Sequence, residues 1–485
     1  MSTPDGTVLT HPPGWSTKAL RTKEQPISFL IAAALRDPDL VNLAAGLVDP
    51  YSLPVDDVRR ITQKILGDEA HGRRALQYDT TLGLADLRRH CLSHLADLEG
   101  KPAAALGYTA DDIVVTTGSQ QALYLIGDLL VDPGDIVIAA NPSYFVYTGT
   151  LQSLGAHVLS VPMDPGGMDV DAVAALLEKL DREGRVDKVK FVYCTSYFDN
   201  PTGLSLAADR RPRLLELVKR YSRKHRILIL EDAAYRELRY DGPDLPSIKS
   251  YDPENRFVVI SHTFSKPFAP GLKLGYTVMP SDLAHAAVQQ KGNHDFGSSS
   301  LAMHVAAEAM ADGSYLAQGK RLRDTYRKKR GLTLAALAEH FGPLGGSGVG
   351  EWSSRGVEKG AESGRRSATP TPPLHHATTP PRISWTHPNG GLYVWLTLPP
   401  GVDTSRTGPL FPAAVSAGVL YVPGDYCFQP DDRGHVPLNH VRLCFGQVHP
   451  DKINLGVERL AAAVAELLEP AGTTTAARRE PALAD

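Results

Sequence analysis

The stretch SHTFSKPFAPGLKLGY, residues 261–276, joins the end of an apolar run to a turn rich in proline and glycine. Lys266 lies between Ser265 and Pro267, where the apolar run stops. Its amine is either that of an ordinary surface lysine at the end of a strand or one that takes part in chemistry. The neighbouring sequence is needed to decide between the two.

This run is one of five short segments that are rich in β-branched and other apolar residues. They are DIVVTTG (112–118), DIVIAA (135–140), VKFVYCT (189–195), RILILED (226–232) and RFVVISHTFS (256–265). Segments with the apolar spacing of helices, such as SQQALYLIGDLL (119–130), separate most of them. Near-continuous apolar strands alternating with helices predict an α/β fold with a mainly parallel sheet and helices on both faces. Such sheets bind ligands at the carboxyl ends of their strands.

The sequence predicts two domains, because its pattern changes after about residue 320. A long amphipathic helix pattern is followed there by a segment rich in Gly, Ser, Pro and Thr. We expect this segment to be a disordered insertion, since it can bury little apolar surface. Strand patterns return at GGLYVWLTLP (390–399) and HVRLCFG (440–446), which predicts a smaller α+β domain. The predicted divisions are an N-terminal arm at 1–25, a large domain at 52–320, a small domain at 26–51 and 321–470, the insertion at 343–382 and a loose tail at 471–485.

Composition and charge exclude several classes of function. The formal net charge is −3, so neither nucleic acid nor an anionic membrane is indicated as a partner. The four cysteines are scattered without a CxxC pair, which indicates no metal site and no disulfide framework and fits a reducing compartment. No apolar run is long enough to span a bilayer, and the first residues lack the pattern of a signal peptide. We therefore expect a cytoplasmic protein without a bound metal.

Three further motifs lie beside the predicted strands, and each has an ordinary structural explanation when taken alone. TGSQQAL (117–123) opens a helix after a glycine, which either binds phosphate or simply caps the helix. DNPTG (199–203) is typical of a turn. EDAAYREL (231–238) places Asp232 at the end of a strand, where an acid is usually a cap or an ion-pair partner. Their order and spacing relative to Lys266 make the combination far more specific than any one motif.

With these motifs in this order, the chain resembles the pyridoxal-phosphate-dependent aminotransferases of fold type I, classes I and II. AAGLVDPYSLP, ALQYDTTLGLADLR, SKPFAPGLKLGY and VRLCFG also have counterparts in that family. The resemblance runs from about residue 40 to 465, outside the insertion, and is strongest to the branch with 2-aminoadipate/kynurenine and multi-substrate aminotransferases. It implies a mainly parallel seven-stranded sheet, pyridoxal phosphate as cofactor and a homodimer with shared active sites. The implied reaction moves an amino group from an L-amino acid to a 2-oxo acid, with 2-oxoglutarate as acceptor, by a ping-pong mechanism.

The resemblance also gives the opening lysine a role. It implies that Lys266 holds the cofactor as a Schiff base and, once substrate frees its amine, moves a proton as general base and acid. This needs a neutral amine, so we expect burial and nearby positive charge to lower the pKa of Lys266. By the same resemblance, Asp232 pairs with the protonated pyridine nitrogen. Asn200 and Tyr235 are implied to bind the 3′-oxygen of the ring.

The remaining cofactor contacts are also implied by the family. Tyr144 is implied to stack on the ring face and is counted with Lys266 and Asp232 as catalytic. The nearby Tyr147 is the residue most easily mistaken for Tyr144. Lys273 departs from the family, which usually has arginine there. Lysine keeps the positive charge but loses the planar fork, so we expect phosphate binding to survive. The implied phosphate ligands are Ser119, Gln120, Thr263, Ser265, Lys273 and, from the neighbouring subunit, Tyr78.

Arg442, in VRLCFG, matches the arginine that binds the substrate α-carboxylate. A planar guanidinium holds a carboxylate through two parallel hydrogen bonds. The alternative is a surface charge on a strand of the small domain, but we favour a pocket because Val441 and Leu443 on either side are apolar. Asn200 and Gly46 are implied to lie beside the substrate as well.

Three alternatives to an aminotransferase remain compatible with the motifs. A β-lyase or a cyclopropane-carboxylate synthase uses the same fold, lysine and aspartate, because fold and cofactor do not fix the reaction. A second alternative is a pyridoxal-phosphate-binding regulator, which also carries a DNA-binding module. Fewer than about 45 residues precede the motifs here, too few for such a module. An inactive scaffold is the third, and the intact motif residues argue against it.

Overall fold

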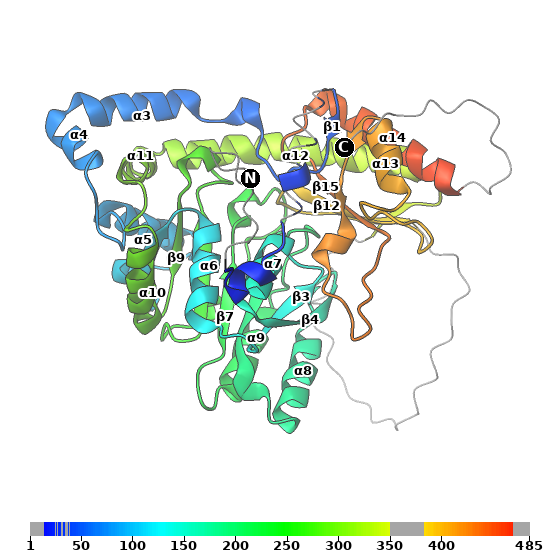
Figure 1. The fold of residues 1–485 in the computed structure, drawn as a ribbon. Coiled ribbons are helices and arrows are strands. Elements are labelled where there is room, and N and C mark those ends of the chain that lie inside the picture. Colours follow the sequence, from blue (N-terminus) through cyan, green and yellow to red (C-terminus); the bar gives the residue numbers. More distant parts are fainter. Residues whose placement is uncertain are drawn as a thin grey trace, which may run out of the picture.

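The structure, a computed structural model, describes residues 14–24, 26, 28–30, 33, 37, 39–349 and 383–468. Figure 1 shows a large α/β domain with a smaller domain above it. The predicted tail at 471–485 and residues 350–382 of the predicted insertion lie outside the described residues. Among the described helices, none is long and apolar enough to cross a membrane.

The large domain is organised around one sheet with the strand order β2-β9-β8-β7-β6-β3-β4-β5. Adjacent strands are parallel except where β9 pairs with its two neighbours and where β5 pairs with β4. The predicted mainly parallel sheet is therefore confirmed. The bounds are β2 Ile113–Thr116, β3 Ile136–Asn141, β4 His157–Asp164, β5 Gly167–Met168, β6 Val189–Thr195, β7 Leu228–Asp232, β8 Val258–Thr263 and β9 Gly275–Val278.

The strand β5 makes the sheet eight-stranded, one strand more than the seven predicted. It contains only Gly167 and Met168 and pairs antiparallel with the end of β4. Two residues are too few to produce an apolar run of their own, so this strand leaves no periodic signal in the sequence.

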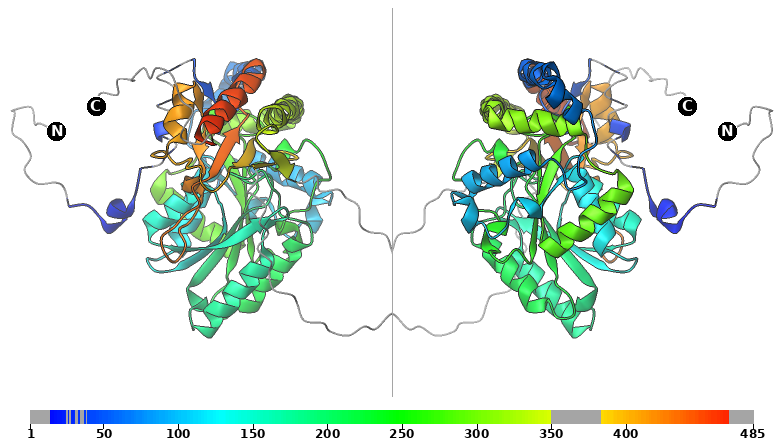
Figure 2. Two further views of the ribbon diagram at one scale, coloured as in Figure 1. Left: turned by 90° about the vertical axis from the view of Figure 1, so that its right-hand side faces the viewer. Right: turned by 90° about the vertical axis from the view of Figure 1, so that its left-hand side faces the viewer.

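Helices cover both faces of the sheet, as predicted for an α/β fold (Figure 2). Along β3, Val137 and Ala139 pack in the core that includes α6 and α7, whereas Ile136 and Ile138 pack in the core that includes α8 and α9. This alternation follows from the opposite directions of successive side chains in a strand. The bounds are α5 Ala85–Glu99, α6 Ser119–Leu130, α7 Phe145–Leu154, α8 Val170–Arg182, α9 Arg210–Tyr221, α10 Ser281–His294 and α11 Ser300–Ala311.

The smaller domain is built on a five-stranded sheet with the order β10-β11-β12-β15-β14. A two-stranded sheet joins β1, near the start of the chain, to β13 in parallel, so the start of the family-like region belongs to the smaller domain. The helix α12 packs against α14 (Figure 1). The bounds are β1 Val41–Asn42, β10 Ser347–Val349, β11 Ser384–Thr386, β12 Tyr393–Thr397, β13 Val419–Leu420, β14 Val422–Pro423, β15 His440–Cys444, α12 Ser314–Phe341, α13 Leu410–Ser416 and α14 Pro450–Leu468.

The N-terminal part of the chain also contains the helices α1 Thr17–Arg21, α3 Val55–Gly67 and α4 Glu69–Ala75. The short α1 lies on α7, where Arg21 donates to the carbonyl of Ser153 at 3.1 Å. Lys18 adds an ion pair with Asp128 at 3.3 Å. Residues of the predicted arm therefore contact the large domain.

The predicted start of the disordered insertion at residue 343 is wrong. Residues 343–349 are described, and Ser347–Val349 form strand β10, which pairs in parallel with β11. The amide of Gly346 donates to the carbonyl of Phe341, and the amide of Ser347 donates to that of Ile383. Backbone hydrogen bonds thus give order to a glycine-rich segment that offers little apolar surface, which composition does not reveal.

The register of the large sheet brings the carboxyl ends of its strands together. Thr195 at the end of β6 lies beside Asp232 at the end of β7, and Asp232 lies beside Ser261 of β8. Because parallel strands all end on the same side, motifs that are far apart in sequence meet at this edge of the sheet.

Candidate active site

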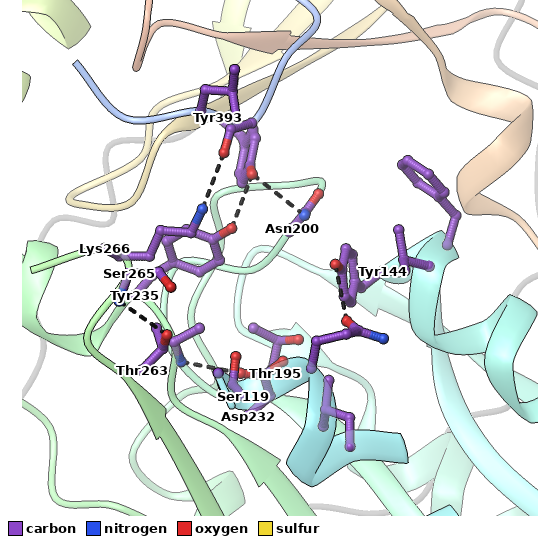
Figure 3. A pocket seen from close by; sticks show the side chains of 18 of the residues that line it. Ser119, Tyr144, Thr195, Asn200, Asp232, Tyr235, Thr263, Ser265, Lys266 and Tyr393 are labelled. Atoms are coloured by element: carbon purple, nitrogen blue, oxygen red, sulfur yellow. Dashed lines mark hydrogen bonds between the residues drawn. The ribbon is translucent and has the colours of Figure 1, made fainter. Parts of the chain in front are cut away.

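A cavity of about 270 Å³ lies at this edge, between the large sheet and the smaller domain (Figure 3). All the predicted site residues except Tyr78 line it. Those that line it are Gly46, Ser119, Gln120, Tyr144, Asn200, Asp232, Tyr235, Thr263, Ser265, Lys266, Lys273 and Arg442.

The amine of Lys266 faces this cavity from the turn after β8. It donates to the carbonyl of Gly46 at 3.1 Å and lies 5.8 Å from the ring centre of Tyr235. Burial lowers the pKa of the Lys266 amine, and the positive charges of Arg442 and Lys273 lower it further. The amine therefore loses its proton more readily than an exposed lysine does, as expected from the sequence.

Asp232 ends β7 with its side chain at the floor of the cavity and only 6% of the residue exposed. One carboxylate oxygen accepts from the hydroxyl of Tyr193 at 3.0 Å, and the other from the amide of Ala234 at 3.1 Å. Burial raises the pKa of Asp232, and Lys266 opposes that change. A buried carboxylate with two fixed donors is oriented to meet a cationic partner, which would stabilise its charged form.

The N-terminus of α6 forms another wall of the cavity. Gly118 precedes the helix with φ +76° and provides no side-chain cap, so the first amides of α6 remain available as donors. Gly275 lies against this turn, where a Cβ atom would come within 2.7 Å of the Ser119 nitrogen. Only glycine fits this close approach of β9 to the start of α6.

Two hydroxyls and a cation extend this helix terminus. The amide of Ser265 donates to the hydroxyl of Thr263 at 3.1 Å, which holds the turn before Lys266 in place. Lys273 lines the cavity from a left-handed backbone position with φ +53°. Amides, hydroxyls and an ammonium group at a helix N-terminus form a binding site for a phosphate group.

The structure separates the two candidate tyrosines after β3. Tyr144 lines the cavity, and its hydroxyl donates to Gln120 at 3.3 Å. Tyr147 is fully buried in the core, where its ring packs edge-on against Tyr193 with centres 4.7 Å apart. Tyr147 thus has no access to a ligand in this cavity.

Arg442 enters the cavity from the smaller domain, on β15. Its guanidinium donates to the Asn200 side-chain oxygen and to the carbonyl of Ala44, each at 2.8 Å. Arg442 is 2% exposed, and among the described residues it forms no ion pair with a carboxylate. A buried arginine held by neutral oxygens has donors available for a carboxylate that enters the cavity.

Tyr78 is the one predicted site residue that the structure does not bring to the cavity. It is 83% exposed, and its ring lies 6.0 Å from that of Phe296. Within a single chain it contacts none of the other predicted site residues.

Sequence reasoning missed two tyrosines that belong to this site. Tyr193 lies in the predicted strand 189–195 and supports Asp232, and Tyr393 lies in the predicted strand 390–399 and lines the cavity. In both strands every second residue faces the same way, but the sequence does not show which set faces the cavity. The glycines before Tyr393 were the available signal, since they allow the close approach of the chain that follows.

The cavity fits pyridoxal phosphate, whose aldehyde, ring nitrogen and phosphate each need a different partner. A lysine amine with a lowered pKa, a buried oriented carboxylate and an open helix N-terminus with nearby hydroxyls line the same cavity. Together with the parallel sheet, this arrangement defines a pyridoxal-phosphate-dependent enzyme of fold type I.

Comparison with known proteins gives the family. The family described as aminotransferase class I and II matches residues 38–349. The aromatic-amino-acid aminotransferase 1 of Thermococcus litoralis is 33% identical over 453 residues, covering 93% of this chain and 94% of the relative. The 2-aminoadipate transaminase of Thermus thermophilus is 28% identical over 433 residues, covering 89% and 91%. The crystal structure of Pyrococcus horikoshii kynurenine aminotransferase is 30% identical, covers 94% of this chain and 98% of its own, and superposes with a TM-score of 0.78.

This chain belongs to the class I and II aminotransferases. It is a transaminase that uses pyridoxal phosphate and transfers an amino group between an amino acid and a 2-oxo acid. The lyase, synthase and regulator alternatives are not favoured by these comparisons.

Proposed function

We propose that this chain transfers the amino group of an L-amino acid to 2-oxoglutarate by a ping-pong mechanism. The observation that carries the proposal is that one cavity holds the Lys266 amine from the large domain and the Arg442 guanidinium from the smaller one. Such a pair fixes an amino acid by its carboxylate while a base reaches its α-carbon. Pyridoxal phosphate, when bound, supplies an aldehyde that condenses with amines and a ring that takes up electrons.

In this proposal Lys266 holds the cofactor covalently and then carries the proton. Its lowered pKa supports the role, because a neutral amine is required both to condense and to accept a proton. Asp232 stabilises positive charge on the ring nitrogen, with its orientation fixed by Tyr193. Tyr144 covers one face of the ring, and Asn200 and Tyr235 bind the ring oxygen.

Arg442 holds the α-carboxylate of the substrate, with Asn200 and Gly46 beside it. The carbonyl of Gly46 already accepts from Lys266, and the Asn200 oxygen accepts from Arg442, so the proposed base and the proposed carboxylate site each have a fixed hydrogen-bond partner. The polar groups at both ends of the cavity are thereby fixed before substrate binds.

The donor is an L-amino acid with a large apolar or aromatic side chain. The cavity is also lined by Leu47, Phe145 and Val146, which offer apolar contacts. Two of the relatives described above are named for aromatic amino acids and kynurenine, which carry aromatic rings, whereas the third is named for 2-aminoadipate, which carries a carboxylate. A large apolar side chain gains free energy by leaving water at such a wall.

The phosphate of the cofactor is held by Ser119, Gln120, Thr263, Ser265 and Lys273, and a substitution at Lys273 tests this. We expect Lys273→Ala to weaken the binding of pyridoxal phosphate by about ten-fold, because a charge-assisted contact contributes roughly 1.5 kcal/mol. Lys273→Arg should bind at least as tightly, since it restores a planar fork. Titrating the apoprotein with the cofactor measures both, and equal affinity in Lys273→Ala and the wild type would contradict the assignment.

The active unit is a homodimer, in which Tyr78 of each chain reaches the phosphate site of the other. The strong exposure of Tyr78, Leu76 and Phe296 supports this, because an apolar patch of that kind is typical of an interface. Light scattering gives the mass in solution. Loss of cofactor affinity in Tyr78→Ala, with the dimer retained, would support the shared site, and a monomer with full activity would contradict it.

We also place the protein in the cytoplasm. Cys91, Cys194, Cys427 and Cys444 are all buried and unpaired, which fits a reducing compartment. Fractionation of cells that express a tagged chain tests the location, and recovery outside the cytoplasmic fraction would contradict it.

The proposed reaction is tested by visible absorption spectra with a panel of L-amino acids. Purified protein loaded with pyridoxal phosphate should show a visible band that borohydride bleaches. Large apolar and aromatic donors should remove the band, and 2-oxoglutarate should restore it. Release of ammonia with pyruvate would instead identify a lyase, and a band that no amino acid changes would contradict amino transfer.

A further inference from the structure

The hydroxyl group of Tyr393 lies between the proposed cofactor ligands and the proposed carboxylate site. The Tyr393 hydroxyl is 2.9 Å from that of Tyr235, and the Asn200 side-chain nitrogen donates to it at 3.5 Å (Figure 3). The Arg442 guanidinium lies 4.6 Å from the ring centre of Tyr393. Tyr393 therefore touches three residues to which a role in binding has been given above.

The position of Tyr393 is fixed by the fold. It begins β12, pairs with Cys444 of β15 and is 1% exposed. Gly46 closes the space above it, where a Cβ atom would lie 2.5 Å from the Tyr393 oxygen. The hydroxyl thus has little freedom to leave its contact with Tyr235.

The chemistry of Arg442 and Asn200 fixes the direction of two hydrogen bonds in this group. Arginine has donors only, so the Asn200 atom that faces Arg442 must be the oxygen, and the amide nitrogen must face Tyr393. The Tyr393 oxygen accepts this bond, and its own proton is available for donation to the Tyr235 oxygen 2.9 Å away. In that arrangement the proton of Tyr235 points into the cavity.

The charges of the site favour the same direction. Burial raises the pKa of Tyr235 well above its usual range, so this hydroxyl keeps its proton. Burial also raises the pKa of Tyr393, to about 12, but the adjacent Arg442 holds it down. Arg442 lowers the pKa of both hydroxyls and is the leading charge acting on Tyr393, which favours Tyr393 as the donor of the pair.

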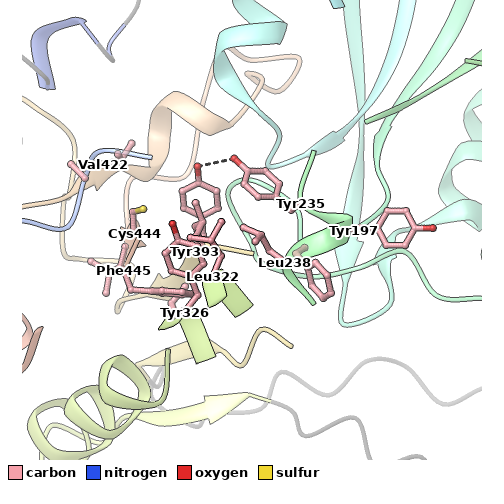
Figure 4. Close-up of a cluster of buried hydrophobic side chains, with 14 of the residues drawn as sticks. Tyr197, Tyr235, Leu238, Leu322, Tyr326, Tyr393, Val422, Cys444 and Phe445 are labelled. Atoms are coloured by element: carbon pink, nitrogen blue, oxygen red, sulfur yellow. Dashed lines mark hydrogen bonds between the residues drawn. The ribbon is translucent and has the colours of Figure 1, made fainter. Parts of the chain in front are cut away.

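We propose that Tyr393 is a positioning residue of amino transfer, whose hydroxyl directs the proton of Tyr235 toward the cofactor's ring oxygen. The inference rests on the proposed roles of Tyr235 and Asn200 and adds a residue to them. Tyr393 itself acts through Tyr235. The rival explanation is packing alone, because the ring is part of a buried cluster with Leu322, Tyr326 and Phe445 (Figure 4).

Two matched substitutions separate positioning from packing. Tyr393→Phe keeps the ring and removes only the hydroxyl. Tyr326→Phe makes the same change in the same cluster, at a fully buried tyrosine whose hydroxyl accepts from the amide of Asp49 at 2.9 Å and does not line the cavity. A change caused by loosened packing would appear in both variants, whereas a change in the direction of Tyr235 would appear only in the first.

The main readout is the pH midpoint at which the visible absorption of the loaded, substrate-free protein changes. A hydrogen bond donated to the ring oxygen favours the deprotonated form of the bound cofactor. Weakening this hydrogen bond in Tyr393→Phe should therefore raise the pH midpoint by about half a pH unit or more. We expect kcat to fall by about three- to ten-fold, the effect of one hydrogen bond, with KM nearly unchanged. Tyr326→Phe should keep the wild-type midpoint and kcat.

A double substitution provides a second, independent measurement. If Tyr393 acts through Tyr235, then adding Tyr393→Phe to Tyr235→Phe should shift the midpoint little further, because the two residues form one unit. Fully additive shifts would overturn the inference, as would an unchanged midpoint in Tyr393→Phe or an equal shift in Tyr326→Phe. A wild-type protein without the band would overturn the proposed residue roles as well, whereas a normal wild-type band with an unshifted variant overturns this inference alone.

Discussion

Replacing Lys266 by alanine is expected to lower kcat for amino transfer by about 10⁴-fold or more, because one amine provides both the covalent attachment and the proton transfer. The Lys266 amine lies in the cavity, held by the carbonyl of Gly46, and burial and two neighbouring cations lower its pKa. The variant should also lose the visible band that borohydride bleaches. Steady-state rates and absorption spectra measure the two effects.

The control for this substitution is Lys224→Ala, which removes a side chain that is 77% exposed and does not line the cavity. It should retain wild-type activity and spectrum. Added methylamine should restore part of the activity of Lys266→Ala, since a small amine fits the space of the deleted side chain and accepts a proton there. Turnover near the wild-type rate in Lys266→Ala without added amine would exclude this lysine as the base.

Replacing Asp232 by asparagine is expected to lower kcat by about 10²- to 10³-fold, the loss associated with one oriented electrostatic contact. Asparagine has nearly the same shape, so the contacts of this side chain with Tyr193 and Ala234 limit the structural change. It carries no charge, however, and cannot stabilise a cationic ring nitrogen. The cofactor should still bind and absorb in the visible range, so the defect should appear in kcat.

Asp169→Asn is the matched control, because Asp169 caps α8 and accepts from the amides of Asp171 and Ala172. Asparagine caps helices about as well as aspartate, so stability and activity should both remain close to the wild type. Wild-type kcat in Asp232→Asn would show that the negative charge is not needed. A coincident loss of thermal stability and of cofactor would point to a folding defect instead.

The sequence predicted those parts of the molecule that depend on repeated local patterns. Five apolar segments gave the strands β2, β3, β6, β7 and β8, and their parallel arrangement placed the motif residues at one edge of the sheet. Asp232 is an example: its position at the end of a buried strand was enough to place it beside the neighbouring strand ends.

Features set by single contacts were not predictable. Tyr393 lies on β12 of the smaller domain, whereas Tyr235 lies in the large domain, directly before the short helix η5, Arg236–Leu238. The contact between the two tyrosines therefore depends on how these segments of the two domains approach each other. The glycines before Tyr393 indicate a close approach of the chain, but they do not show that Tyr235 is the residue approached. The strand β10 was missed for a related reason, because backbone pairing with β11 gives order to residues whose composition indicates a flexible loop.

The strands β10 and β11 pair in parallel, so both run in the same direction along their shared ladder. Two parallel neighbours cannot be joined by a tight turn and need a connection of about a dozen residues or more. The ladder between Ser347–Val349 and Ser384–Thr386 therefore does not rest on a hairpin, and its register is set by the pairing of the two strands themselves.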